Sequence, residues 1–175
     1  MEDLHLNSVK KYLINFKYPP NHNRPNLKYG NEIHYGCALG LINNRPVSYT
    51  KLGLPKQAEC RLLKNKRYAE CFLYGIYLFN HLTKDLKFHY TTIQYNYNQV
   101  SKKHKDKKNI GESYIVAIGD YTGGRLKVWK DEKGEGEPDY IDIKDKLYKF
   151  NGSKYYHETE PFEGERISLV YFSIL

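Results

Sequence analysis

The chain has 175 residues and a mass of 20.7 kDa, a length that predicts a single domain with a substantial core. Hydrophobic residues make up 40% of it and aromatic residues 15%, with 18 tyrosines, so a folded, strand-rich protein is favoured over a disordered chain. The net charge of +8 permits attraction to DNA, RNA or other polyanions, but it specifies no partner.

The three cysteines, Cys37, Cys60 and Cys71, are an odd number and form no CxxC pair. No signal peptide opens the chain, and no run approaches the ~20 apolar residues of a membrane span. We therefore expect a soluble intracellular protein, cytoplasmic or nuclear, that stays out of the membrane and keeps its thiols reduced.

The first part of the chain, to about residue 55, is broken by prolines, as in "YPPNHNRPN". We expect loops there, with short strands such as "IHYGCALGLI". From Gln57 to about Asp85 the apolar residues recur at helical spacing, which predicts one long helix or two helices separated near Asn65. His81 lies on or beside the apolar face of that helix and is expected to pack in the core.

From Phe88 onward, short β-rich runs alternate with turn segments such as "TGG", "KGEGEP" and "FNGS", at roughly the 8–12-residue spacing of a sandwich or barrel. The runs are "FHYTTIQYNYNQV", "SYIVAIGDY", "RLKVWKD", "DYIDIKD", "KLYKF", "KYYHETEPF" and "RISLVYFSIL". Helices followed by an all-β half predict an α+β fold within one domain, residues 1–175. Residues 88–175 would form a double-stranded β-helix (jelly-roll/cupin-like) core, buttressed by helices and loops from residues 1–87.

His104 and Asp106 follow the first of these runs, inside the lysine-rich stretch "KKHKDKK", and His157 lies on a later run. A basic stretch of this kind is by itself typical of a solvated loop. However, side chains two apart on an extended segment point to the same side, and a rolled sheet can bring a third ligand to them. Two histidines and a carboxylate can occupy one face of an Fe(II) octahedron. The remaining histidines lack CxxC or HExxH partners: His5, His22, His34, His81 and His89.

Arg166 follows His157 by nine positions, and Ser168 comes two residues later. On a strand these two side chains share a face, where a guanidinium fork and a hydroxyl could together clamp a carboxylate. Arg166 alone would be taken for an exposed strand residue. The order His-x-Asp, a distant His and then Arg-x-Ser, all within a β-rich half, makes a ligand-binding interpretation more specific.

In this order of motifs the sequence resembles the 2-oxoglutarate- and Fe(II)-dependent oxygenases, over residues 88–175. The resemblance implies an oxidoreductase, a dioxygenase that hydroxylates a substrate C–H with Fe(II), 2-oxoglutarate and O2. It also implies a role for each motif residue. The catalytic iron ligands would be His104, Asp106 and His157, and the contacts of 2-oxoglutarate would be Arg166, Ser168 and Tyr95.

A narrower resemblance lies in "HKDKKNIGES", which is similar to the His-x-Asp-x-x-Asn pattern of the ten-eleven translocation and base J-binding (TET/JBP) group. That group oxidises 5-methylpyrimidines in DNA. The resemblance implies that Asn109 holds the target base and that Phe172 stacks on it. The chain departs from the pattern at Ile174, where the group's well-studied DNA enzymes place a histidine.

The substrate stays open between a methyl group of a 5-methylpyrimidine in DNA or RNA and a protein side chain such as Pro, Lys or Asn. Basic residues at the mouth of the iron pocket would favour nucleic acid, whereas scattered ones would favour a protein or small molecule. A third alternative is a non-enzymatic basic β module that binds nucleic acid by aromatic stacking. It predicts that His104, Asp106 and His157 stay apart in space.

Overall fold

The computed structural model describes residues 2–21, 33–41 and 66–174. Several sequence expectations fall outside these ranges, among them Cys60, His22 and the part of the predicted helix before residue 66. The described cysteines, Cys37 and Cys71, are buried and are not joined in a disulfide, and burial raises the pKa of the Cys71 thiol. Within the described ranges, no helix has the length and apolar character needed to cross a bilayer.

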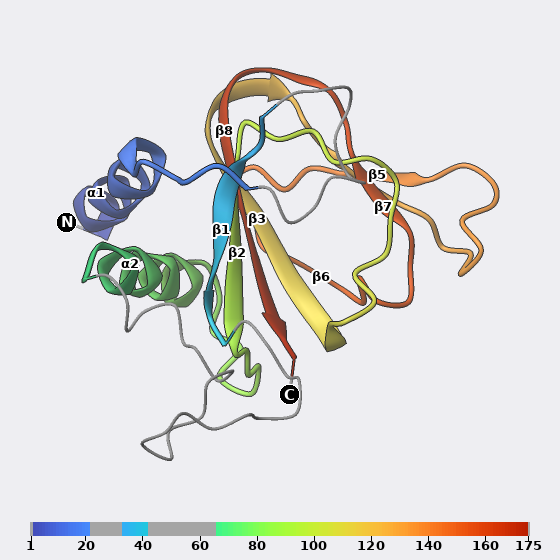
Figure 1. Cartoon of the computed structure of the whole chain (residues 1–175), viewed down its shortest axis with the longest axis horizontal. Coiled ribbons are helices and arrows are strands. Elements are labelled where there is room, and N and C mark those ends of the chain that lie inside the picture. The colour runs from blue at the N-terminus through green and yellow to red at the C-terminus, as the bar shows by residue number, and fades with distance from the viewer. Residues whose placement is uncertain (1, 22–32, 42–65, 175) are drawn as a thin grey trace, which may run out of the picture.

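The described chain forms two helices followed, apart from one early strand, by an all-β half (Figure 1). The elements are α1 (Glu2–Asn15), β1 (Tyr35–Gly40), α2 (Lys66–Leu82), β2 (Thr92–Tyr97), β3 (Ile110–Gly123), β4 (Leu126–Val128), β5 (Asp139–Ile141), β6 (Tyr148–Phe150), β7 (His157–Thr159) and β8 (Phe162–Ser173). Each of the seven predicted β-rich runs overlaps one of the strands β2 to β8, and β1 lies in the predicted strand "IHYGCALGLI".

Helix α1 corrects the expectation of loops and short strands at the start of the chain. Its apolar stripe is short: Val9 and Leu13 are buried, and Leu6 packs beside them. The hydroxyl of Tyr18 donates to the carbonyl of Leu13 at 2.7 Å and so satisfies one of the last-turn carbonyls that a helix leaves unpaired.

Helix α2 buries Cys71, Gly75, Leu78 and Phe79, which lie along one stripe of the helix. The expectation that His81 packs in the core is wrong, because residue 81 falls off this stripe and is exposed in the last turn. A helix C-terminus favours such a placement for a residue that can carry positive charge.

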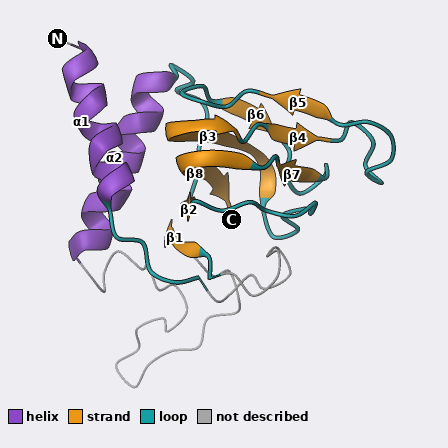
Figure 2. Cartoon of the chain, turned by 90° about the horizontal axis from the view of Figure 1, so that it is seen from above, coloured by secondary structure: helices purple, strands orange, loops and turns teal. Residues whose placement is uncertain are grey.

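The strands form two antiparallel sheets, which confirms the predicted jelly roll. The five-stranded sheet has the order β1-β2-β8-β3-β6 and the three-stranded sheet the order β5-β4-β7. Figure 2 shows α1 and α2 side by side on one side of the five-stranded sheet, with β4, β5 and β7 on its other side. We call the face toward the helices the outer face and the face toward the three-stranded sheet the inner face.

Alternation along the central strands assigns each side chain to one of these faces. On β8, Leu169 belongs to the cluster that packs against the helices, whereas Val170 packs with β4 side chains between the sheets. On β2, Ile93 and Tyr95 likewise join the helix-side cluster. The inner face is therefore formed by the residues at even positions of β2 and β8, including Arg166 and Ser168.

Gly75 is the contact point between α2 and the outer face. A β-carbon at this position would lie 2.2 Å from the Tyr95 hydroxyl and 3.0 Å from the Ile93 side chain. That hydroxyl donates to the Cys71 carbonyl at 2.9 Å, and the Tyr171 hydroxyl donates to the Gly75 carbonyl at 2.6 Å.

We expect Gly75→Ala to lower the free energy of unfolding by about 1–3 kcal/mol, the usual cost of overpacking a core. The direction of the change is informative, because helix propensity alone would make the Ala variant more stable than the parent by about 1 kcal/mol. Urea denaturation measures the change, with Asn80→Ala on the exposed side of α2 as the control, expected to stay within about 0.5 kcal/mol of the parent. A Gly75→Ala protein more stable than the parent would contradict this packing.

Candidate metal centre and carboxylate anchor

His104 and His157 lie side by side because their backbones form an isolated antiparallel bridge. Each backbone N–H donates to the carbonyl of the other residue at 3.0 Å, and the two ring centroids are 4.3 Å apart. Asp106 is fixed by its own N–H, which donates to the Gly152 carbonyl at 2.8 Å. One donor atom from each of the three side chains lies within 4.8 Å of the other two, so together they could hold one metal ion. The binding-module alternative predicted that they stay apart, and that prediction is wrong.

The tautomer of both imidazoles is fixed by backbone carbonyls two residues earlier. His157 Nδ1 lies 3.1 Å from the Tyr155 carbonyl oxygen, and His104 Nδ1 contacts that of Lys102. Because a carbonyl only accepts, these contacts require a proton on each Nδ1. In the neutral imidazole that tautomer leaves the Nε2 lone pair available to a cation.

Both Nε2 atoms face the Asp106 carboxylate. The distances are 3.1 Å from His157 Nε2 to Asp106 Oδ2 and 3.5 Å from His104 Nε2 to Asp106 Oδ1. Lone pairs and carboxylate oxygens repel unless a proton or a metal ion lies between them. Two nitrogens and one oxygen on one side of the ion are the donor set typical of non-haem Fe(II), so the residues present fit this metal.

The surroundings of the three side chains are compact. The Phe150 ring meets the His157 ring edge to face at a centroid distance of 5.1 Å. Gly152 lies next to the same group, where a β-carbon would lie 3.4 Å from Asp106 Oδ2, from His157 Cε1 and from the Phe150 ring. The side chain of Asn151 closes this turn by accepting the N–H groups of Ser153 and Lys154, each at 3.1 Å.

The lysines flanking His104 hold this loop to the rest of the fold. Lys103 Nζ lies 4.1 Å from the centroid of the Trp129 ring and donates to the Gly134 carbonyl at 2.6 Å. Lys105 Nζ lies 4.7 Å from the centroid of the Tyr156 ring. Cation–π contacts of this kind hold the loop against the residues that flank β4 and β7 of the three-stranded sheet. The part of the lysine-rich stretch around His104 is therefore anchored to the fold rather than freely solvated.

Arg166 is buried on the inner face with 2% of its surface exposed. Its Nη2 donates to the Gly124 carbonyl at 3.1 Å, and the guanidinium lies 5.5 Å from the ring centroids of both Tyr121 and Phe162. Its Nε has no hydrogen-bond partner, and no carboxylate of the described residues forms an ion pair with it. Burial lowers the pKa of this guanidinium, while the neighbouring Tyr121 acts in the opposite direction. A buried cation without a counter-ion is costly and suits an anionic ligand.

Ser168 lies two residues along the same face as Arg166, as the sequence predicts, and its Oγ accepts a hydrogen bond from Asn96 Nδ2 at 3.2 Å. The structure does not bring Tyr95 to this group. Tyr95 lies on the outer face, because neighbouring strand residues point to opposite sides, and its hydroxyl bonds to α2. Asn96 also lies on the inner face and was not predicted from the sequence, although strand alternation would have indicated it.

A cavity of about 190 Å³ lies beside Asp106. It is lined by Gln94, Asp106, Lys108, Asn109, Val170, Phe172 and Ile174, so the structure brings both predicted substrate residues to the same place. Gln94 and Lys108 were not predicted. Among the described residues, Lys108 is the one basic side chain that lines this cavity. The volume of the cavity is below the roughly 300 Å³ at which drug-sized ligand pockets begin, so the cavity suits a single base or side chain.

Two solved structures resemble this fold over nearly its whole length. An oxidoreductase of the 2OG-Fe(II) oxygenase family from Burkholderia pseudomallei is 16% identical, with a TM-score of 0.52 over 97% of this chain and 76% of that one. OsALKBH1 is 9% identical, with a TM-score of 0.52 over 98% of this chain and 93% of that one. No protein-family model and no curated sequence matches the chain. These similarities show a fold shared with the 2-oxoglutarate- and Fe(II)-dependent oxygenases.

The donor set predicts that a divalent metal ion stabilises the protein. At a concentration of 100 times its Kd, Mn(II) or Fe(II) should add about 2.7 kcal/mol to the free energy of unfolding. His157→Ala should abolish the rise in Tm, because it removes one of the three donors. His81→Ala, which removes an exposed histidine from α2, is the matched control and should keep the full rise. Equal shifts in both variants would place the metal elsewhere.

Proposed function

We propose that the protein is a 2-oxoglutarate- and Fe(II)-dependent dioxygenase that hydroxylates a substrate C–H. The observation that supports this most directly is the pairing of two features on one jelly roll. His104, Asp106 and His157 converge with both Nε2 atoms facing the carboxylate. A buried Arg166, which has no carboxylate partner among the described residues, lies on the inner face of the neighbouring sheet. The three candidate metal ligands alone would be compatible with several classes of metalloenzyme. The buried guanidinium narrows the choice to enzymes that bind an anionic cosubstrate.

When bound, Fe(II) with 2-oxoglutarate and O2 supplies oxidising power: one oxygen atom enters the substrate C–H, and the other leaves in succinate as CO2 is released. The chain holds and orients these groups. His104, Asp106 and His157 would bind the metal, while Arg166 and Ser168 would bind the distal carboxylate of 2-oxoglutarate through charge-assisted hydrogen bonds. The apolar cluster between the sheets, which includes Tyr121 and Phe162 beside the guanidinium, excludes water and strengthens that attraction.

For the substrate, we propose the methyl group of a 5-methylpyrimidine in nucleic acid. Support comes from the cavity beside Asp106, where Asn109, Gln94 and Phe172 line one small space. Amides can read the edge of a base while an aromatic ring stacks on its face, as a base held outside its helix requires. Ile174 lines the same cavity and offers an apolar surface in place of a hydrogen-bonding group.

A second candidate is hydroxylation of a protein side chain, such as Pro, Lys or Asn. The observation that favours it is the scarcity of positive charge at the cavity, where Lys108 is the basic side chain among the described lining residues. Lys103 and Lys105 point to aromatic rings instead. A nucleic-acid substrate would gain most from cations arranged along its backbone.

Arg166→Met separates the cosubstrate role from a structural one. We expect the affinity for 2-oxoglutarate to fall at least about thirtyfold, because removing one partner of a buried charge pair costs roughly 2–5 kcal/mol. We also expect no loss of folding stability, since a neutral chain of similar length replaces an unpaired buried cation. Anaerobic calorimetry of metal-loaded protein and urea denaturation measure the two quantities.

Arg125→Met is the control for that experiment, because Arg125 is exposed and paired with Glu160 at 2.8 Å. It should bind 2-oxoglutarate as the parent does. If Arg166→Met also keeps the parental affinity, Arg166 is not the anchor.

The substrate proposal predicts that single-stranded DNA containing 5-methylcytosine stimulates the conversion of 2-oxoglutarate to succinate and gains one oxygen atom. Phe172→Ala should reduce this stimulation about 5- to 150-fold, given about 1–3 kcal/mol for stacking one base on an aromatic ring. Mass spectrometry of the oligonucleotide and a succinate assay provide the readouts. Tyr140→Ala, which removes a 46% exposed ring outside the cavity, is the control. Stimulation by a peptide and not by the oligonucleotide would select the second candidate.

A further inference from the structure

Asn98 directly follows the last residue of β2 and has an unusual backbone conformation. Its φ is +46°, a left-handed conformation that Asn adopts more readily than most residues with a side chain. Its backbone N–H donates to the Arg166 carbonyl at 2.8 Å, and its side-chain Oδ1 accepts the Arg166 N–H, also at 2.8 Å. Both backbone polar groups of Arg166 are therefore held by this one residue.

The register explains why a side chain is needed here. Tyr97 pairs with Ile167, so the next rung of the ladder would join Asn98 to Arg166 through two backbone hydrogen bonds. Because Asn98 turns left-handed, the strand ends at this rung, and its side-chain oxygen replaces the backbone carbonyl as the acceptor. The chain can then leave the sheet toward His104 without releasing Arg166.

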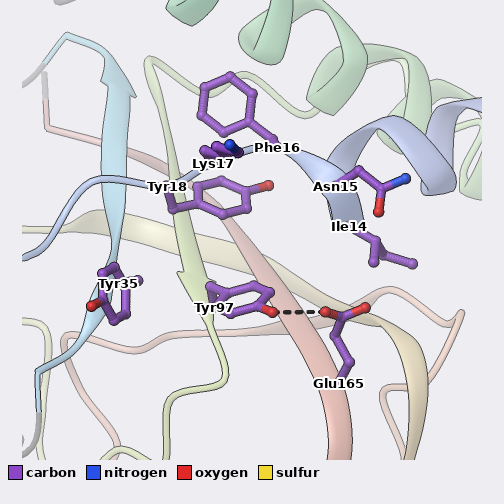
Figure 3. A pocket seen from close by; sticks show the side chains of 8 residues that line it. All are labelled: Ile14, Asn15, Phe16, Lys17, Tyr18, Tyr35, Tyr97 and Glu165. Atoms are coloured by element: carbon purple, nitrogen blue, oxygen red, sulfur yellow. Dashed lines mark hydrogen bonds between the residues drawn. The ribbon is translucent and has the colours of Figure 1, made fainter.

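A second contact ties the same strand end on the opposite face. The hydroxyl of Tyr97 donates to Glu165 Oε2 at 2.7 Å, at the edge of an outer-face cavity of about 420 Å³ (Figure 3). This bond joins the neighbours of Asn98 and Arg166. The Tyr97 side chain also forms a hydrogen bond with the Asn98 side chain, but neither contact involves Arg166. The Tyr97 hydroxyl offers a matched comparison, because its loss loosens the same end of β2 without freeing the backbone of Arg166.

We propose that Asn98 is a positioning residue for the carboxylate anchor. It acts through Arg166, whose backbone it fixes so that the guanidinium stays beside the rings of Tyr121 and Phe162 with donors left for the ligand. This inference rests on the proposed function, in which Arg166 binds 2-oxoglutarate. A buried charged group works only when it is held in the right geometry, because a small displacement weakens both its hydrogen bonds and its attraction to the ligand.

The test compares three variants of the full chain by anaerobic calorimetry with metal and 2-oxoglutarate. Asn98→Gly keeps the left-handed backbone but removes the acceptor, and it should weaken 2-oxoglutarate binding about tenfold, within the range for leaving one donor unsatisfied. Asn98→Asp keeps the acceptor and tolerates the backbone conformation, and it should bind within about threefold of the parent. Tyr97→Phe should bind as the parent does. Metal affinity without 2-oxoglutarate should be equal in all of them.

Hydrogen exchange supplies a readout that needs no cosubstrate. The Arg166 amide should exchange faster in Asn98→Gly than in the parent, whereas in Tyr97→Phe it should stay protected. Parental 2-oxoglutarate affinity in Asn98→Gly would overturn the positioning role, as would an equal loss in Tyr97→Phe or a large loss in Asn98→Asp. A metal-loaded parent that fails to bind 2-oxoglutarate would instead overturn the proposed function, so the two failures are distinguishable.

Discussion

The pairing of β8 between β2 and β3 is the constraint on which the rest of the structure depends. Both neighbours run antiparallel to it, and its register fixes the face to which the paired side chains of β2 and of β3 from Tyr114 onward point. Leu169 and its outer-face neighbours bury apolar surface against the helices. The inner face of the same strand carries Arg166 and Ser168. The core and the candidate ligand site are thus two faces of one strand, and a slip of one residue would lose both.

Sequence reasoning worked best where spacing alone carries geometric information. His104 and Asp106 are two residues apart, so an extended segment is enough to point both side chains to the same side. The same holds for Arg166 and Ser168 on a strand. The jelly roll could be predicted because turn signals recur at regular intervals through the second half of the chain. Bringing His157 to the other two candidate ligands needed a closed sheet, and the backbone bridge with His104 provides that closure.

The expectations that were wrong or incomplete concern properties that depend on tertiary context. Tyr95 was placed by its distance from His104 along the chain, but the face on which it lies is set by pairing with β8. Helix α1 has a stripe of few apolar residues, including Val9 and Leu13, and the prolines that follow suggested loops. Asn98 has no sequence signature, because its role arises from a left-handed turn at one rung of a ladder.

The unpaired guanidinium has a consequence for the lifetime of the protein. A fold that contains an uncompensated buried charge is less stable without its anionic ligand, and a ligand that binds only the folded state adds stability by mass action. On the proposed function, 2-oxoglutarate would then be both reactant and folding partner. Since the open population exposed to proteases falls as the free energy of unfolding rises, the abundance of this protein would follow the supply of its cosubstrate.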